Sequence, residues 1–205
     1  MHKTQGRSAQ TKVNRSLRMV LLFALWSPNF LGCVAGPKVE SEKELGSPRQ
    51  VFLVRHAERE WEGEDPPLTP AGEARAQALA ETLRDAGITA IITTQWRRTR
   101  DTAQPLAKLL KITPEVIPVY DDARENVQKV AAAVRRHKDE TVLVVGHITV
   151  TAVIAALGGP RLPTICEPVF SQLLLFTPAL GENGLVRLLY GAPEDISRRC
   201  RLEPD

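Results

Sequence analysis

The hydrophobic residues of this chain occur in short continuous runs, separated by longer segments in which apolar residues recur with a helical period. The runs that end at Arg55 and at Gly146 are strongly apolar, which is typical of strands buried on both faces. The pattern predicts strands at 50–55, 88–93, 115–119, 141–146, 172–176 and 185–190, and helices at about 70–86, 98–110, 123–137 and 150–157. Strands that alternate with helices indicate an α/β fold, here a three-layer α/β/α sandwich whose mainly parallel sheet ends in an antiparallel edge.

Two residues indicate where helices begin. Thr69 can cap the first helix, because Pro70 then takes the first helical position, where an N–H is not needed. Asp122 can cap the third helix in the same way.

The positive charge of the chain is concentrated at its N-terminus. The formal net charge is +3, but residues 1–33 hold five Lys and Arg and no acid. The remainder carries 22 Lys and Arg (27 less 5) against 24 Asp and Glu, so no nucleic-acid partner is expected. An apolar run over residues 19–26 is too short to span a bilayer, and residues 1–33 are therefore predicted to be a signal peptide.

The end of this segment resembles the lipobox of a bacterial lipoprotein. Gly32 directly precedes Cys33, although Phe30 stands where leucine is usual. We therefore expect an exported protein that a lipid on Cys33 anchors to the membrane, facing the periplasm or the cell exterior, with residues 34–49 as a tether. The alternatives are ordinary cleavage after Gly36, which leaves a soluble periplasmic protein, and an uncleaved membrane anchor.

The predicted folded domain spans residues 50–192 and is followed by a tail, 193–205. In an oxidising compartment Cys166 and Cys200 can form a disulfide. The alternative is one buried thiol and one thiol in the tail.

Charged residues and histidines follow the ends of the four strands predicted to be parallel. They are Arg55, His56, Arg98, Asp121, Asp122 and His147. The carboxyl ends of parallel strands meet at one edge of the sheet, where ligands of such folds bind. Two guanidinium groups beside two imidazoles suggest a dianionic ligand, since a guanidinium fork matches phosphate oxygens. A metal site made of His56, Glu58 and His147 is disfavoured because the arginines would repel a cation, so no cofactor is expected.

Four motifs in the same order resemble the histidine phosphatase superfamily, which includes phosphoglycerate mutases. Arg55-His56-Ala57-Glu58 is similar to its RHG or RHxE signature. Segments 67–72, 93–103 and 144–147 are similar to its PLTxxG, SSPLxRAxQTA and VGH segments. The resemblance extends from residue 51 to about 190, and segment 146–160 is similar to small exported bacterial members.

The resemblance implies roles for the residues at the strand ends. His56 would be the nucleophile that becomes a phosphohistidine, while Arg55, Arg98 and His147 would hold the phosphoryl oxygens. The proton donor would be Asp121 or Asp122.

Two further acids enter with less defined roles. Glu125 is another candidate for the proton donor. Glu58, on the substrate-binding side of the site, would orient the nearby loop or a basic group.

The expected activity is hydrolysis of a small phosphorylated substrate, a phosphomonoester, by a phosphatase. One alternative is a mutase, which must keep the phosphoryl group from water; no added segment is long enough to form such a lid. The other is a non-catalytic, anion-binding lipoprotein on the same fold. The intact Arg-His and Gly-His motifs argue against it, but the changed residues around Gln95-Trp96 and Ile148 leave it open.

Overall fold

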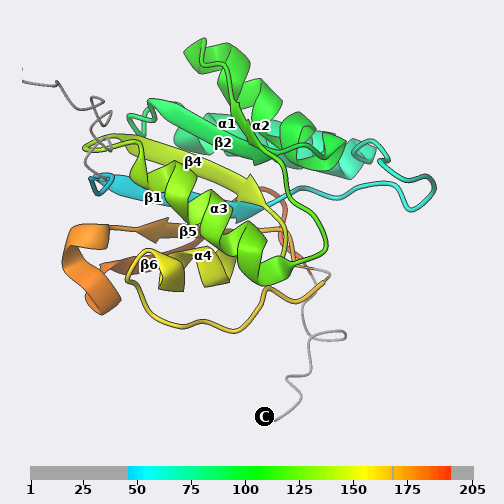
Figure 1. The fold of residues 1–205 in the computed structure, drawn as a ribbon. Helices are drawn as coiled ribbons and strands as arrows, with labels where there is room; N and C mark the ends of the chain where they lie inside the picture. The colour runs from blue at the N-terminus through cyan, green and yellow to red at the C-terminus, as the bar shows by residue number, and fades with distance from the viewer. Residues whose placement is uncertain (1–45, 168, 195–205) are drawn as a thin grey trace, which may run out of the picture. The chain divides into compact units, whose positions relative to one another are not determined.

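The computed structural model describes residues 46–167 and 169–194 (Figure 1). The predicted signal peptide, most of the tether, the lipidation site Cys33 and most of the C-terminal tail lie outside the described residues. Within the described ranges, none of the helices has the length and apolar character needed to cross a membrane.

Six strands form one sheet in the order β3-β2-β4-β1-β5-β6 (Figure 1). Four are parallel and adjacent: β3 (Glu115–Ile117), β2 (Ala90–Thr94), β4 (Thr141–Gly146) and β1 (Gln50–Arg55). β5 (Gln172–Phe176) runs antiparallel to β1, and β6 (Leu185–Leu189) runs antiparallel to β5. A 3₁₀ segment, η1 (Pro178–Gly184), connects β5 to β6. The mainly parallel sheet with an antiparallel edge is confirmed.

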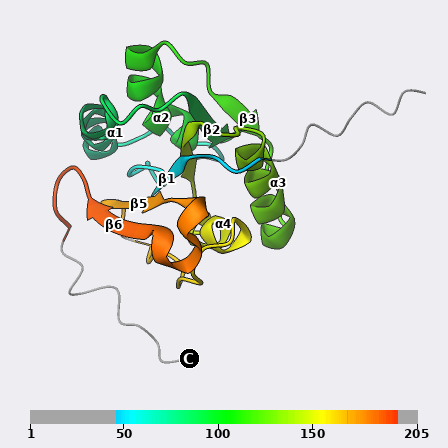
Figure 2. The same ribbon diagram turned by 90° about the vertical axis from the view of Figure 1, so that its left-hand side faces the viewer.

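Helices cover both faces of the sheet (Figure 2). On one face, α1 (Pro70–Leu83) and α2 (Arg97–Leu110) pack their apolar residues against the side chains of Phe52, Val54 and Leu143. On the other, α3 (Ala123–Arg135) and α4 (Val150–Ala156) pack against Leu53 and Val144. Successive residues of β1 and β4 alternate between the two clusters, so both strands are buried on both faces, and the three-layer sandwich is confirmed.

The two predicted caps are present. The Thr69 hydroxyl accepts a hydrogen bond from the Gly72 N–H at 3.0 Å, and the Asp122 carboxylate accepts one from the Glu125 N–H at 2.9 Å. Gly72 also allows α1 to begin close to the end of β1, because a Cβ there would overlap the carbonyl oxygen of Glu58.

β2 and β3 differ from their predicted ranges. β2 begins at Ala90, where its pairing with β4 starts, although Ile88 is buried in the core as its hydrophobicity predicts. β3 ends at Ile117 because Pro118 follows, and proline has no N–H to continue a ladder.

Candidate active site

Two histidines leave adjacent parallel strands at the same level. Arg55 at the end of β1 pairs in register with Gly146 at the end of β4, so His56 and His147 follow side by side. The His56 N–H donates to the Gly146 carbonyl at 2.8 Å, and the two imidazole rings stack with centroids 5.2 Å apart. The predicted convergence of the two histidines at the sheet edge is thus present in the structure.

The His56 ring is oriented by a backbone carbonyl. Its Nδ1 lies 2.8 Å from the Ala57 carbonyl oxygen, which can only accept, so Nδ1 carries the proton. Nε2 is then left with a free lone pair, and it is buried without a hydrogen-bond partner among the described residues. Burial lowers the pKa of His56 to about 3, and the charge of Arg55 adds to this. The arrangement keeps a neutral imidazole with an unshared lone pair at neutral pH.

Arg55 is buried beside His56, with a side chain that is only 3 % exposed. Its Nη1 donates to the Cys166 carbonyl at 3.2 Å and also to the Glu167 carbonyl, and its Nη2 donates to the Glu167 carboxylate at 3.0 Å. The guanidinium lies 4.3 Å from the centroid of the Phe170 ring. Nε has no partner, so one donor of this arginine remains unused.

Arg98 lies in the first turn of α2, stacked over the Trp96 ring at 4.8 Å. The helix is joined to the β1 end by Thr102, whose hydroxyl accepts from the Ala57 N–H at 2.9 Å and donates to the Arg98 carbonyl at 2.7 Å. Nε of Arg98 is buried and unpartnered as well. Burial lowers the pKa of both arginines from its usual value.

These unpartnered atoms are concentrated at one place. Five buried side-chain nitrogen or oxygen atoms in the described part of the chain lack a partner, and three of them are Nε of Arg55, Nε2 of His56 and Nε of Arg98. Buried polar atoms are normally satisfied, and such a cluster is typical of a site whose ligand supplies the missing partners. Two fixed cations beside a neutral imidazole suit an oxyanion such as a phosphoryl group.

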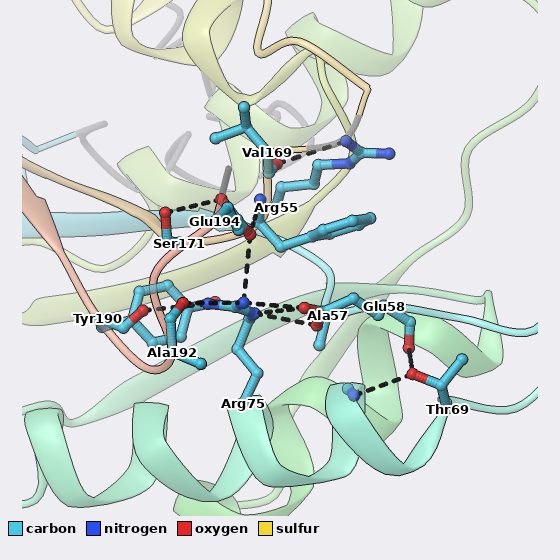
Figure 3. A network of polar contacts seen from close by, with 12 residues as sticks. Arg55, Ala57, Glu58, Thr69, Arg75, Val169, Ser171, Tyr190, Ala192 and Glu194 are labelled. Carbon is cyan, nitrogen blue, oxygen red and sulfur yellow. Dashed lines mark hydrogen bonds and ion pairs between the residues drawn. The ribbon is translucent and has the colours of Figure 1, made fainter. Parts of the chain in front are cut away.

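Glu58 is held by an arginine that the sequence motifs did not single out (Figure 3). Arg75, 4 % exposed on α1, donates from Nε and Nη2 to the Glu58 carboxylate at 2.8–3.0 Å. It also donates to the Tyr190 and Ala192 carbonyls at 3.1 and 3.2 Å, and it forms a 3.2 Å ion pair with Glu194. Glu58 therefore orients a basic group, as expected, while its direct contact with a substrate stays a prediction.

The same network reaches the aromatic wall of the site (Figure 3). Glu194 accepts from the Phe170 N–H at 2.6 Å and from the Ser171 hydroxyl at 2.8 Å. Phe170 in turn lies 6.0 Å from the His56 ring, centroid to centroid. Arg75 thus stabilises both the end of β1 and the segment that packs on the candidate nucleophile.

The candidate acids are placed differently from one another. Asp122 is engaged in the cap of α3, whereas Asp121 lies at a cavity that Arg98 and His147 also line. Glu125 is exposed and pairs with Lys129 at 2.8 Å. Of the two aspartates, Asp121 is the one whose carboxylate has no capping role.

Sequence reasoning missed Glu167. Its carboxylate pairs with Arg55, as described above, and lies 4.0 Å from Nε2 of His147. Burial lowers the pKa of His147 to about 4, with Arg55 adding to the effect and Glu167 opposing it. No motif marks Glu167, because the segment around it has no hydrophobic period.

Two cavities flank the cluster. One, of about 280 Å³, is lined by residues that include His56, Trp61, Glu167 and Phe170. The other, of about 200 Å³, lies on the side of Arg98 and His147 and extends between the sheet and α3.

Cys166 is close to this site, and its partly buried side chain packs against the hydrophobic core. It is disulfide-bonded, whereas the other two cysteines lie outside the described residues. Its pairing with Cys200 therefore stays a prediction.

Comparisons with known proteins support the family that the motifs suggested, and the family model covers the first three of the four motifs. The sequence model of the family described as "Histidine phosphatase superfamily (branch 1)" matches residues 51–122. A "Probable phosphoglycerate mutase GpmB" of Photorhabdus laumondii subsp. laumondii is 43% identical over 173 residues, which cover 75% of this chain and 80% of the relative. The protein of the same name from Klebsiella pneumoniae is 38% identical over 97 residues, 44% of this chain, and the match spans only 43% of that relative's length.

A solved structure shares the fold. The protein histidine phosphatase SixA complexed with tungstate is 20% identical, with a TM-score of 0.52, over 70% of this chain and 96% of that one. At this identity the likeness concerns the fold alone.

Proposed function

The chain belongs to the histidine phosphatase superfamily (branch 1), a superfamily of phosphatases and mutases, and we propose that it is a phosphatase that hydrolyses phosphomonoesters through a phosphohistidine on His56. The observation that carries the proposal is that Nε2 of His56 and the Nε atoms of two neighbouring arginines, Arg55 and Arg98, are all buried without a partner among the described residues. A nucleophilic nitrogen with a free lone pair and two cations that each keep an unpartnered Nε are groups suited to a transferred phosphoryl group.

In the first step, the Nε2 lone pair attacks phosphorus while the bond to the leaving oxygen breaks. The proton on Nδ1 stays on the ring, held by the Ala57 carbonyl, which stabilises the charge that develops on the imidazole. The leaving oxygen takes a proton from an acid, for which Asp121 is the better placed of the two predicted aspartates. In the second step a water oxygen attacks phosphorus, a proton of the water returns to the acid, and Nε2 recovers its lone pair.

Arg55, Arg98 and His147 would stabilise the charge on the phosphoryl oxygens during both steps. Because the three groups are fixed by β1, α2 and β4, little reorganisation is needed when charge develops. Glu167 accepts from Nη2 of Arg55, so its carboxylate would compete with a phosphoryl dianion for this arginine.

The names of the relatives favour a mutase, which transfers the same phosphoryl group to a second organic oxygen. A mutase has to keep water from the phosphohistidine until that acceptor binds. The His147 side chain is 40 % exposed, and water can therefore approach the site, which supports hydrolysis.

The test uses the full chain and its His56→Ala variant, with His137→Ala as a matched control. His137 pairs with Glu115 away from the site. The wild type and the control should turn over p-nitrophenyl phosphate and acquire an acid-labile phosphate label, and His56→Ala should do neither. Substantial turnover by His56→Ala would refute the mechanism. Release of inorganic phosphate from phosphoglycerate indicates hydrolysis, and accumulation of an isomeric phosphoglycerate indicates a mutase.

We also propose that the protein is exported and anchored through Cys33. The charged and apolar N-terminal run supports this, and a disulfide at Cys166 suits an oxidising compartment. Ordinary signal cleavage remains the alternative.

A further inference from the structure

The cavity beside Arg98 and His147 is apolar inside. Its volume is about 200 Å³, and its inner wall comes from β2, β4, α3 and α4. The apolar residues that line it are Ile92, Val127, Val130, Val144, Val150 and Val153. Its polar residues include Arg98, His147 and Asp121, which belong to the candidate site. A group attached to a phosphoryl bound there can therefore enter the cavity.

Val119 and Tyr120, which line one side of this cavity, are held in position by two amide side chains. Gln95 accepts from the Val119 N–H at 2.9 Å and donates to the Val119 carbonyl. Asn126 accepts from the Tyr120 N–H at 2.9 Å and donates to the Tyr120 carbonyl. Each amide thus occupies both backbone groups of one residue, so the wall that carries Tyr120 is fixed without a strand.

Two hydroxyls at the wall are also satisfied within the protein. The Thr94 and Thr99 hydroxyls bond to each other at 2.9 Å, and the Thr99 hydroxyl donates to the Trp96 carbonyl. Thr93 also lines the cavity, and its hydroxyl is buried without a partner among the described residues. A leaving group with several hydroxyls would lose its water there and find few new partners, which is costly.

The size of the cavity fits one ring. An apolar cavity of about 150 Å³ accommodates benzene. We propose that the substrates of this protein are phosphomonoesters of phenolic or other ring-sized apolar alcohols, with the ring in the cavity between β4 and α3. This substrate class rests on the proposed function, since it assumes that the phosphoryl group lies at His56.

Binding of two phosphonates, which cannot be hydrolysed, tests the inference without turnover. Phenylphosphonate and methylphosphonate share the anionic group and differ in the ring. Burying roughly 100 Å² of additional apolar surface corresponds to on the order of 50-fold tighter binding of phenylphosphonate by calorimetry. Equal dissociation constants for the two ligands would overturn the proposal.

A cavity-filling substitution, Val127→Phe, tests whether the phenyl ring binds in this cavity. Val127 lines the cavity on α3 and has no part in the candidate catalytic cluster, and the larger side chain should fill the space. The variant should lose most of the preference for phenylphosphonate and keep its affinity for methylphosphonate. Gln128→Phe, one residue along on the exposed side of α3, is the matched control and should keep the preference. If Val127→Phe does not fold, Ala123→Phe at the exposed edge of the same cavity replaces it.

The two proposals fail in different ways. A wild type that prefers phenylphosphonate but turns over no phosphomonoester refutes the phosphatase proposal and leaves the ligand class standing. A wild type that hydrolyses phenyl phosphate and glycerol phosphate, with no difference between the two phosphonates, refutes only the ligand class. An unchanged preference in a folded cavity-filling variant would place the ring elsewhere and overturn the proposal.

Discussion

As the pH falls, His56 should make the folded protein less stable. This effect begins at pH values at which His56 is still unprotonated in the native state. The side chain is 1 % exposed, and burial lowers its pKa from 6.5 to about 3. Between these two values the unfolded chain binds a proton at this position and the folded protein does not. The free energy of unfolding therefore falls as the pH decreases through this window.

The size of the effect follows from the difference in pKa. A fall of about 3.5 in the pKa on folding corresponds to about 4–5 kcal/mol when the whole window is crossed, at about 1.4 kcal/mol for each pH unit. Such a loss is comparable to the total stability of many domains, 5–15 kcal/mol. The figure of about 4–5 kcal/mol covers His56 alone. It does not include His147, whose side chain is 40 % exposed and better screened by water.

Urea unfolding at pH 4.5, 5.5, 6.5 and 7.5 measures this contribution when the wild type is compared with His56→Asn. The asparagine amide can still donate to the Ala57 carbonyl but cannot be protonated. The variant should gain about 2–3 kcal/mol relative to the wild type between pH 6.5 and 4.5, while carboxylates and His147 titrate in both proteins. Parallel stability curves would show that His56 is not buried as a neutral imidazole, and the reasoning would be wrong.

Four other changes have defined outcomes. Arg75→Met should lower the free energy of unfolding by about 3–5 kcal/mol in thermal or urea unfolding, because it leaves two partly buried carboxylates unpaired; Arg84→Met, in an exposed pair, should change it little. Glu167→Gln should strengthen inhibition by inorganic phosphate several-fold, and weaker inhibition would contradict the competition for the buried arginine. Asp121→Asn should reduce turnover of alkyl phosphates by roughly 10²-fold and of aryl phosphates far less, since an aryl group leaves without a proton; equal losses would argue against a proton donor. Cys33→Ala should release the protein from the membrane fraction, and unchanged lipid labelling would refute the anchor.

The sequence predicted the centre of the sheet better than its margin. β1 and β4 have their predicted bounds because each is buried on both faces, so the apolar run and the strand coincide. β3 contacts only the end of β2, and Pro118 cuts it short although Val119 is apolar. Where pairing rather than burial decides the end of a strand, the hydrophobic pattern extends too far.

The catalytic cluster was predictable because strand ends placed it. Arg55 ends β1, His56 and His147 directly follow β1 and β4, and the parallel register brings the three residues together. Arg75 and Glu167 were not predictable from a motif. Arg75 joins the nearby Glu58 to the distant Tyr190 carbonyl, and the partner of Glu167 is the Arg55 guanidinium, more than a hundred residues away in the sequence. Such contacts depend on how loops fold back over the sheet edge, which neither periodicity nor spacing encodes.

In the proposed mechanism, phosphoryl binding and the loop after α4 are coupled through Arg55. This arginine donates to two successive carbonyls of the loop, those of Cys166 and Glu167, while its Nε is buried without a partner among the described residues. The Glu167 carboxylate accepts from Nη2 of the same guanidinium and would compete there with a phosphoryl dianion. Phe170, which lies over the same guanidinium, is fixed from the other side by Glu194. The loop can thus yield at Glu167 while Phe170 stays in place, so binding a dianion changes the charge beside His147 without disturbing the wall that keeps His56 neutral.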